Sequence, residues 1–238
     1  MAFFCFLGVI ACCLLFFVDT NLYLMGSVLF IVSNLGAGAS IVFYNSYLSD
    51  ITTEDQRDKV SSWGFAAGYA SGVLMLIFNL IFLSNCEKWG ISTRLAVRIC
   101  LLIVGLWWGG FSLITFTCLR RRQPVQAVPE DQHYIAAGLG QLVQTFRDLF
   151  RLKHTLHFLI GYLLYNDGIQ TVISVSSIYI VQEVLMKIPT IPDGDYDSIL
   201  IIAFLIAQVV AIFGSLVFER IAHFTSSKSA IIVSLVLW

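Results

Sequence analysis

The feature that most constrains this chain is a series of six long apolar segments separated by short charged ones. They occupy residues 2–18, 22–48, 63–83, 99–119, 156–180 and 199–218. An α-helix needs roughly 17–25 apolar residues to cross the hydrocarbon core of a bilayer. The sequence therefore predicts an all-α, multi-pass membrane protein. A seventh apolar run, residues 230–238, is too short to span.

The composition agrees with this fold class. Of the 238 residues, 58% are hydrophobic and 12% are charged, and the mean hydropathy of +0.84 is too high for a soluble domain of this size. Membrane lipid is thus an expected partner. The six cysteines lie mostly inside apolar runs, so no disulfide framework is expected.

Several function classes find no support in the sequence. It has no basic footprint for nucleic acid, no zinc or phosphate-binding signature and no nucleophile motif. His154 and His157 are three residues apart but have no acidic or cysteine companion, as a metal site would require. We therefore expect no nucleic-acid partner, no metal, no cofactor and no enzymatic activity.

The distribution of basic residues predicts the orientation of the chain. With the amino terminus in the cytoplasm, ten of the 14 Lys and Arg residues fall in the inside loops. Because cytoplasmic loops are enriched in these residues, this orientation is favoured.

The longest inside segment, residues 120–155, is predicted to be a cytoplasmic linker. It begins with Arg120-Arg121-Arg122, contains two prolines, and then shows apolar residues at helical spacing opposite polar ones. This pattern is typical of a helix lying on a membrane surface. The apolar positions are Leu139, Leu142, Val143, Phe146, Leu149 and Phe150.

A polar stripe interrupts the fifth apolar run. At 100° per residue its polar side chains fall on a single arc, and no apolar residue between 166 and 177 shares that arc. Such a stripe predicts the wall of a cavity. Its members are Asn166, Asp167, Gln170, Thr171, Ser174 and Ser177.

Asp167 is the candidate proton-coupling residue within this stripe. A charged group near mid-bilayer costs about 2.5–3.5 kcal/mol on insertion scales and usually marks an ion or substrate path. The alternative is a buried carboxylate that pairs with a neighbouring helix for structural reasons. The adjacent Gly168 is a candidate hinge. The amides and hydroxyls of the stripe can bind either a substrate or a partner helix.

Other spans carry further candidates for the transport pathway. Asn34 and Asn45 lie on one face of the second span, 20° apart, and Gln208 stands alone near the middle of the sixth. A row of small residues in the third span predicts close helix packing rather than chemistry. Its glycines are Gly64, Gly68 and Gly72.

Three segments carry a family resemblance. FYNSYLSDITTEDQRDKVSSWGFAAGYASG, RLAVRICLLIVGLWWGGFSL and GYLLYNDGIQTVISVSSIYI resemble successive blocks of the autophagy-related vacuole effluxer branch of the major facilitator superfamily and its bacterial relatives. The segment containing Glu219 and Arg220 resembles the acidic-Arg loop motif of the superfamily, between its helices eight and nine.

The resemblance implies a secondary transporter that works by alternating access. Its implied activity is the export of amino acids from the vacuole or lysosome to the cytosol during autophagy, and Asp167 makes protons a candidate coupling ion. The implied location is the vacuolar or lysosomal membrane, or the plasma membrane in a prokaryote.

The resemblance also implies a division into lobes. Residues 1–119 would be the remainder of the amino-terminal lobe with four spans, and 120–155 the linker. Residues 156–238 would begin the carboxy-terminal lobe with two spans and a truncated third. Two helices would precede Met1 and three would follow Trp238, so we expect a partial chain. The other interpretation is a truncated, non-transporting membrane scaffold or regulatory isoform.

Overall fold

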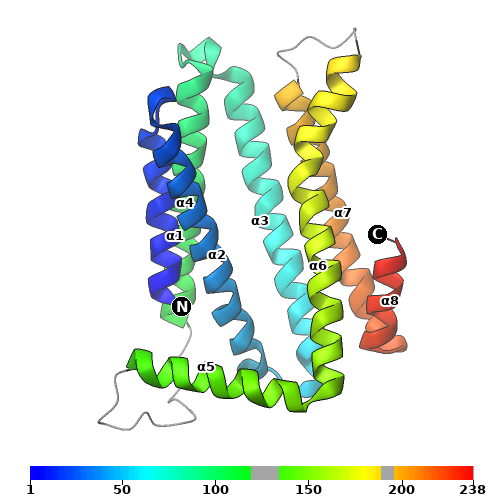
Figure 1. Ribbon diagram of the computed structural model, residues 1–238. Coiled ribbons are helices and arrows are strands. Elements are labelled where there is room, and N and C mark those ends of the chain that lie inside the picture. The colour runs from blue at the N-terminus through cyan, green and yellow to red at the C-terminus, as the bar shows by residue number, and fades with distance from the viewer. Residues whose placement is uncertain (119–133, 189–195, 238) are drawn as a thin grey trace. The chain divides into compact units, whose positions relative to one another are not determined.

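The computed structural model describes residues 1–118, 134–188 and 196–237 (Figure 1). All secondary structure in these ranges is helical. The chain forms two compact units, one containing α1–α4, α7 and α8, the other α5 and α6. The helices are α1 Ala2–Leu14, α2 Tyr23–Ile51, α3 Arg57–Asn85, α4 Thr93–Cys118, α5 Tyr134–Arg151, α6 Lys153–Tyr179, α7 Tyr196–Phe224 and α8 Ser227–Leu237.

Five described helices are long and apolar enough to cross a membrane. The predicted spans at 22–48, 63–83, 99–119, 156–180 and 199–218 each fall on one of them, except that residue 119 lies outside the described ranges. The spanning segments are Tyr23–Leu48, Arg57–Asn85, Thr93–Cys118, Lys153–Lys187 and Ser198–Phe224.

The first apolar run is shorter than a typical span. It forms α1 and a following 3-10 turn, together Ala2–Phe17, which is about 25 Å long. The helix stops because Val18 is extended, just before Asp19. A hydrocarbon core is about 30 Å thick, so the part of this helix that the sequence covers is a few ångströms shorter than the core.

Several helices run further into the charged segments than the sequence predicts. The charged segment 49–61, between the second and third apolar runs, contains the end of α2, a 3-10 turn Glu54–Gln56 and the start of α3. Thr53 precedes this turn and makes no side-chain capping bond. Outside the bilayer a helix still pairs its own backbone groups, and charged side chains do not end it.

The same effect corrects the loop expected around Glu219 and Arg220. Both residues lie inside α7, which continues to Phe224. Only Thr225 and Ser226 separate α7 from α8. Ser227 at the start of α8 donates a hydrogen bond to the Asp58 carboxylate of α3, at 2.7 Å.

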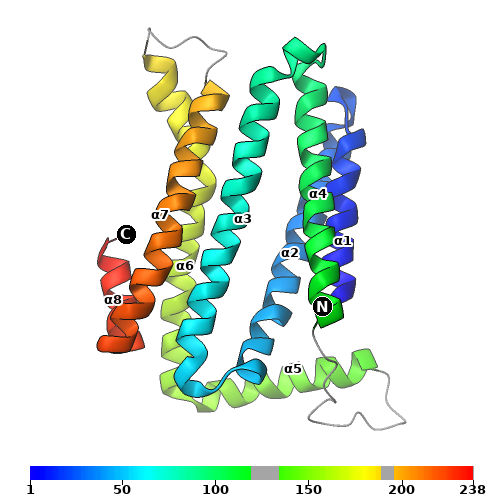
Figure 2. The same ribbon diagram turned by 180° about the vertical axis from the view of Figure 1, so that it is seen from behind.

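The core of the first unit is built from small side chains. α1 packs against α2 and α4, as Figure 2 shows from behind. Small residues let helix backbones approach closely in a membrane, where van der Waals contact drives association. The buried small residues of these helices include Cys5, Gly8, Ala11, Cys12, Gly36, Ser40, Ala96, Cys100, Gly105 and Gly109.

Aromatic and polar contacts fix this packing. The ring of Trp108 lies against Gly8, where a Cβ would collide with it. The Ser33 hydroxyl donates to the Gly8 carbonyl at 3.2 Å, and the Cys5 thiol donates to the Ser112 hydroxyl at 3.0 Å.

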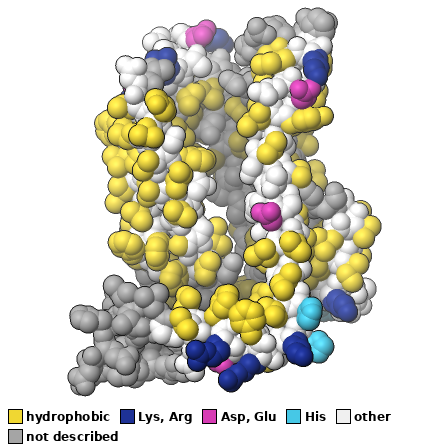
Figure 3. All heavy atoms as spheres, in the orientation of Figure 1, with side chains coloured by type: hydrophobic (Ala, Val, Ile, Leu, Met, Phe, Trp, Pro, Cys, Tyr) yellow, Lys and Arg dark blue, Asp and Glu magenta, His cyan; other side chains and the backbone are white. Residues whose placement is uncertain are grey.

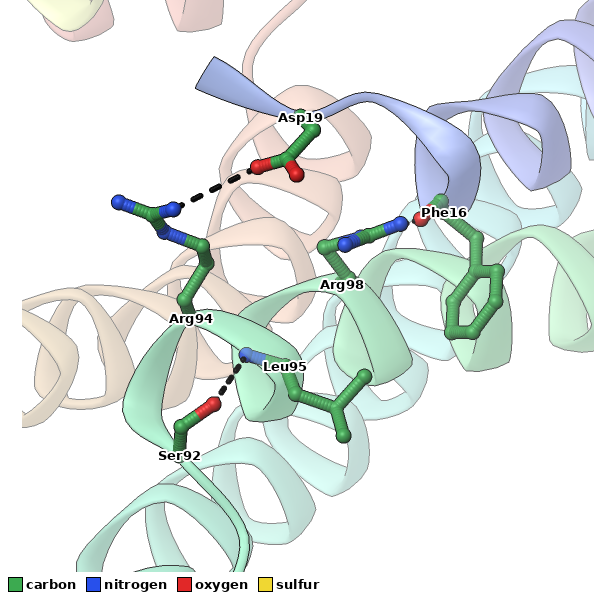
Figure 4. Close-up of polar contacts among 6 residues, drawn as sticks. All are labelled: Phe16, Asp19, Ser92, Arg94, Leu95 and Arg98. Atoms are coloured by element: carbon green, nitrogen blue, oxygen red, sulfur yellow. Dashed lines mark hydrogen bonds and ion pairs between the residues drawn. The ribbon is translucent and has the colours of Figure 1, made fainter.

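Two arginines near the start of α4 bond to residues at the end of α1 (Figure 4). The Arg98 guanidinium donates to the Phe16 carbonyl and lies 5.3 Å above the Phe16 ring centroid. Arg94 pairs with Asp19 at 3.4 Å. Arg98 thereby satisfies one of the carbonyls that a helix end leaves unpaired.

The second unit has a sharp bend. Only Leu152 separates the end of α5 from the start of α6, and Figure 1 shows α5 running across the axis of α6. α6 continues through a π-helical turn Ile180–Val184 and a 3-10 turn Leu185–Lys187.

The close approach of α1 and α2 predicts an asymmetry between two glycines of α2. A Cβ added at Gly36 would lie 2.7 Å from both the Gly8 Cα and the Phe4 carbonyl oxygen, whereas one added at Gly38 would meet nothing within 4 Å. Both Gly→Ala changes gain the same helix propensity. Because backbone atoms cannot move aside cheaply, we expect Gly36→Ala to unfold about 2–10 °C below Gly38→Ala.

Thermal unfolding of the two variants in a neutral detergent measures this difference. Equal unfolding temperatures would show that the α1–α2 contact is not close.

Candidate functional site

A cavity of about 410 Å³ lies between α2 and α3 and reaches α7. We call it the α2–α3 cavity. Its lining residues recur at helical spacing, so one face of each of the first two helices forms a wall. They are Ile41, Tyr44, Asn45, Tyr47, Leu48 and Ile51 of α2, Val60, Ser61, Gly64, Phe65, Gly68 and Tyr69 of α3, and Gln208 of α7.

The glycines of α3 keep this space open. A Cβ added at Gly68 would meet nothing within 4 Å, and one at Gly64 would meet only the Tyr44 hydroxyl, at 3.4 Å. At Gly72 an added Cβ would touch the Gln208 amide, at 3.3–3.5 Å. The glycine row therefore makes room for polar side chains of α2 and α7.

The lining is mostly apolar and carries no Asp, Glu, Lys, Arg or His. Three tyrosines, one serine and two amides supply hydrogen-bonding groups, and aliphatic side chains with Phe65 cover the rest. A mostly apolar pocket with a few placed polar groups is typical of small-molecule sites.

Gln208 is the most unusual group of the lining. Its Oε1 atom is buried and has no hydrogen-bond partner among the described residues. Buried polar atoms are nearly always paired, and an unpaired acceptor costs about 1–3 kcal/mol. This oxygen lies beside Gly72 of α3, 3.5 Å from where a Cβ of that residue would be.

The structure brings together some of the predicted residues. Asn45 and Gln208, from helices far apart in the sequence, line the same cavity with Gly64 and Gly68. Asn34 does not join them. It lies three turns of α2 away, exposed, and its Nδ2 donates to the Phe30 carbonyl at 2.9 Å.

The stripe on α6 belongs to the other compact unit. Asn166 is half-buried there, and Asp167, Gln170, Thr171 and Ser174 are exposed. A Cβ added at Gly168 would meet nothing within 4 Å. The roles of Asp167 and its neighbours in transport stay predictions.

Sequence reasoning missed the tyrosines of the cavity. Tyr44, Tyr47 and Tyr69 lie inside apolar runs, where an amphipathic aromatic is easily taken for packing. Their helical spacing relative to Asn45 and to the glycine row could have predicted that they line the same cavity. Sequence reasoning also missed the hydrogen bond that fixes α4 to α3, from Trp107 Nε1 to the Ser71 hydroxyl at 3.0 Å.

Comparison with known proteins gives consistent relatives. The model of the family described as "Vacuole effluxer Atg22 like" matches residues 1–238. The MFS-type transporter YxiO of Bacillus subtilis is 26% identical over 238 residues, covering 99% of this chain and 53% of that protein. Autophagy-related protein 22-2 of Penicillium rubens is 28% identical over 150 residues, covering 56% of this chain and 24% of that protein.

A third relative is autophagy-related protein 22 of Coccidioides immitis, 26% identical over 230 residues, with coverage of 71% and 37%. The chain thus spans about half the length of the bacterial relative and less of the fungal ones. No solved structure matches it.

The unpaired Gln208 oxygen predicts that this residue lowers the free energy of unfolding. Replacing it with the similarly shaped methionine removes the unsatisfied acceptor, so we expect Gln208→Met to raise the free energy of unfolding by about 1 kcal/mol and the unfolding temperature by a few degrees. Asn34→Leu is the matched control, because that amide is exposed and already paired. Thermal unfolding in detergent tests this, and a lower unfolding temperature for Gln208→Met would mean that the amide stabilises the fold.

Proposed function

The chain belongs to the vacuole effluxer Atg22-like family, and we propose that it forms part of a secondary active transporter that moves a small molecule across a membrane by alternating access. Its relatives are MFS-type transporters and autophagy-related 22 proteins, not enzymes. The observation that carries the proposal is the α2–α3 cavity, with its unpaired Gln208 oxygen.

The position of the cavity supports transport. Its walls are three helices that are each able to cross a membrane. Polar groups are costly in hydrocarbon and are tolerated where they meet other protein groups or a water-filled space. A polar side chain within such walls is therefore suited to transient contact with water and substrate.

Amino acids are the proposed substrate, exported from a vacuole or lysosome to the cytosol. The cavity volume falls in the range of about 300–1,000 Å³ found for small-molecule sites. The Gln208 oxygen could accept a hydrogen bond from an ammonium group, while Asn45 and the tyrosine hydroxyls donate to a carboxylate. The vacuolar location is drawn from the family description, and a bacterial form would work in the cell membrane.

Asp167 is the proposed proton-coupling residue. It is the only acidic residue of α6, in the interior of a helix able to span the membrane. An ionisable group at such a position commonly serves a proton relay. We also propose that residues 1–119 and 156–238 belong to the two lobes of the transporter and that residues 120–155 link them.

Replacing the Asp167 carboxylate with a neutral amide should abolish transport driven by a proton gradient. In vesicles holding the longest native form of the protein, we expect Asp167→Asn to reduce pH-driven amino-acid movement to background, because the amide cannot bind and release a proton. Asp148→Asn, the same change at an exposed residue of α5, is the control and should leave movement unchanged. Full dependence on the pH gradient in Asp167→Asn would refute the coupling role.

The cavity amides should set substrate affinity. One hydrogen bond contributes about 0.5–1.5 kcal/mol, so we expect Gln208→Met and Asn45→Leu each to weaken apparent substrate affinity about 2–10-fold. Asn34→Leu, outside the lining, should leave it unchanged. Radiolabelled amino-acid efflux from loaded vesicles gives these affinities.

Equal effects at positions 34, 45 and 208 would contradict the assignment of the cavity. No efflux from the unaltered protein would favour the non-transporting scaffold or regulatory form.

A further inference from the structure

One face of α5 exposes large apolar side chains. Leu142 is 64% exposed, Val143 and Phe146 are 59% exposed and Phe150 is 58% exposed. They recur at helical spacing on one side of the helix. Burying such a side chain is normally favourable by about 1.5–3 kcal/mol, so this face needs an apolar partner.

The position of α5 indicates what that partner is. Leu152 alone separates it from α6, which belongs to a 35-residue segment able to span a membrane. A helix joined so directly to the end of a span is held at the boundary between hydrocarbon and water.

One edge of the apolar face is turned toward α6. Leu142, Phe146 and Leu149 share a groove with Leu159, which lies almost two turns along α6 from its start, and Gln141, Thr145 and Asp148 line the same groove. This edge of α5 therefore lies on the side from which α6 enters the bilayer. Figure 3 shows hydrophobic side chains on this side of α5 and basic ones on the opposite side.

Basic side chains accompany the apolar face. Arg147, Arg151, Lys153 and His154 are all exposed. The one carboxylate in the described part of α5 and the first turns of α6, Asp148, pairs with Arg151 at 3.6 Å and is itself exposed. The bend therefore keeps an excess of positive charge at the level where phospholipid headgroups lie.

We propose that α5 and the start of α6 form a binding surface for anionic phospholipid, with Leu142, Phe146 and Phe150 among the acyl chains and Arg147, Arg151 and Lys153 against the headgroup phosphates. A lipid surface satisfies both the apolar and the basic side of the helix. A protein partner would have to match both along the whole helix. This interaction is independent of the proposed transport activity.

The occupant of the apolar face can be identified by photo-crosslinking in native membranes. A benzoyl-phenylalanine replaces Phe146 in one variant and Gln144, on the polar side, in a matched control. We expect illumination to give phospholipid adducts at position 146 and none at 144, as read by mass spectrometry of the intact protein. Adducts from position 146 to other residues of this chain, or to a second copy, would overturn the proposal.

The role of charge is tested by lipid titration of the purified protein in neutral detergent. Each basic residue near an anionic surface contributes about a fivefold change in affinity, so Arg147→Gln with Arg151→Gln should weaken phosphatidylglycerol binding roughly 30-fold and leave phosphatidylcholine binding unchanged.

The control removes the same charge elsewhere, by Lys88→Gln with Arg94→Gln at the turn between α3 and α4. It should leave phosphatidylglycerol affinity unchanged. Equal losses in the two double variants would assign the effect to net charge and overturn a specific site on α5.

Discussion

The structure depends on the need of every backbone N–H and C=O group in hydrocarbon to find a partner within the protein. Only helices meet this need segment by segment, so long apolar runs become helices whatever their neighbours do. Once the backbone is paired, the groups that remain unfavourable in hydrocarbon are the polar side chains. The fold gathers some of them around the α2–α3 cavity, and it places charged groups mainly at helix ends and along α5. Space for a ligand and avoidance of lipid are thus two results of the same constraint.

Glycine has two opposite uses in this protein. Gly8 and Gly36 let α1 and α2 touch, whereas Gly64 and Gly68 border open space. The sequence patterns are alike, since both sets lie in apolar runs among small residues. What differs is which atoms approach from the neighbouring helix. The Trp108 ring lies against Gly8 and the α1 backbone lies against Gly36, whereas only the Tyr44 hydroxyl comes near Gly64.

This difference explains which features the sequence could predict. Hydropathy along the chain is local information, so five spans fall where their apolar runs do. Helix ends are less predictable, because residues such as Arg57, Glu219 and Arg220 remain helical beyond the bilayer. A helical wheel predicts one face for Asn34 and Asn45, but it carries no information on depth along α2, and only Asn45 lines the cavity. Its meeting with Gln208 depends on how α7 packs against α3, which no local pattern encodes.

Because only Leu152 separates α5 from α6, a tilt of α6 is expected to move α5 with it. With 18 residues, α5 is about 27 Å long, so a 10° tilt of the joined pair would move its far end by about 5 Å. Such a tilt would lift the apolar face of α5 away from the acyl chains or press it deeper. Bilayer thickness influences the preferred tilt of a span. A change in thickness would therefore affect both the tilt of α6 and the depth of α5 at its end.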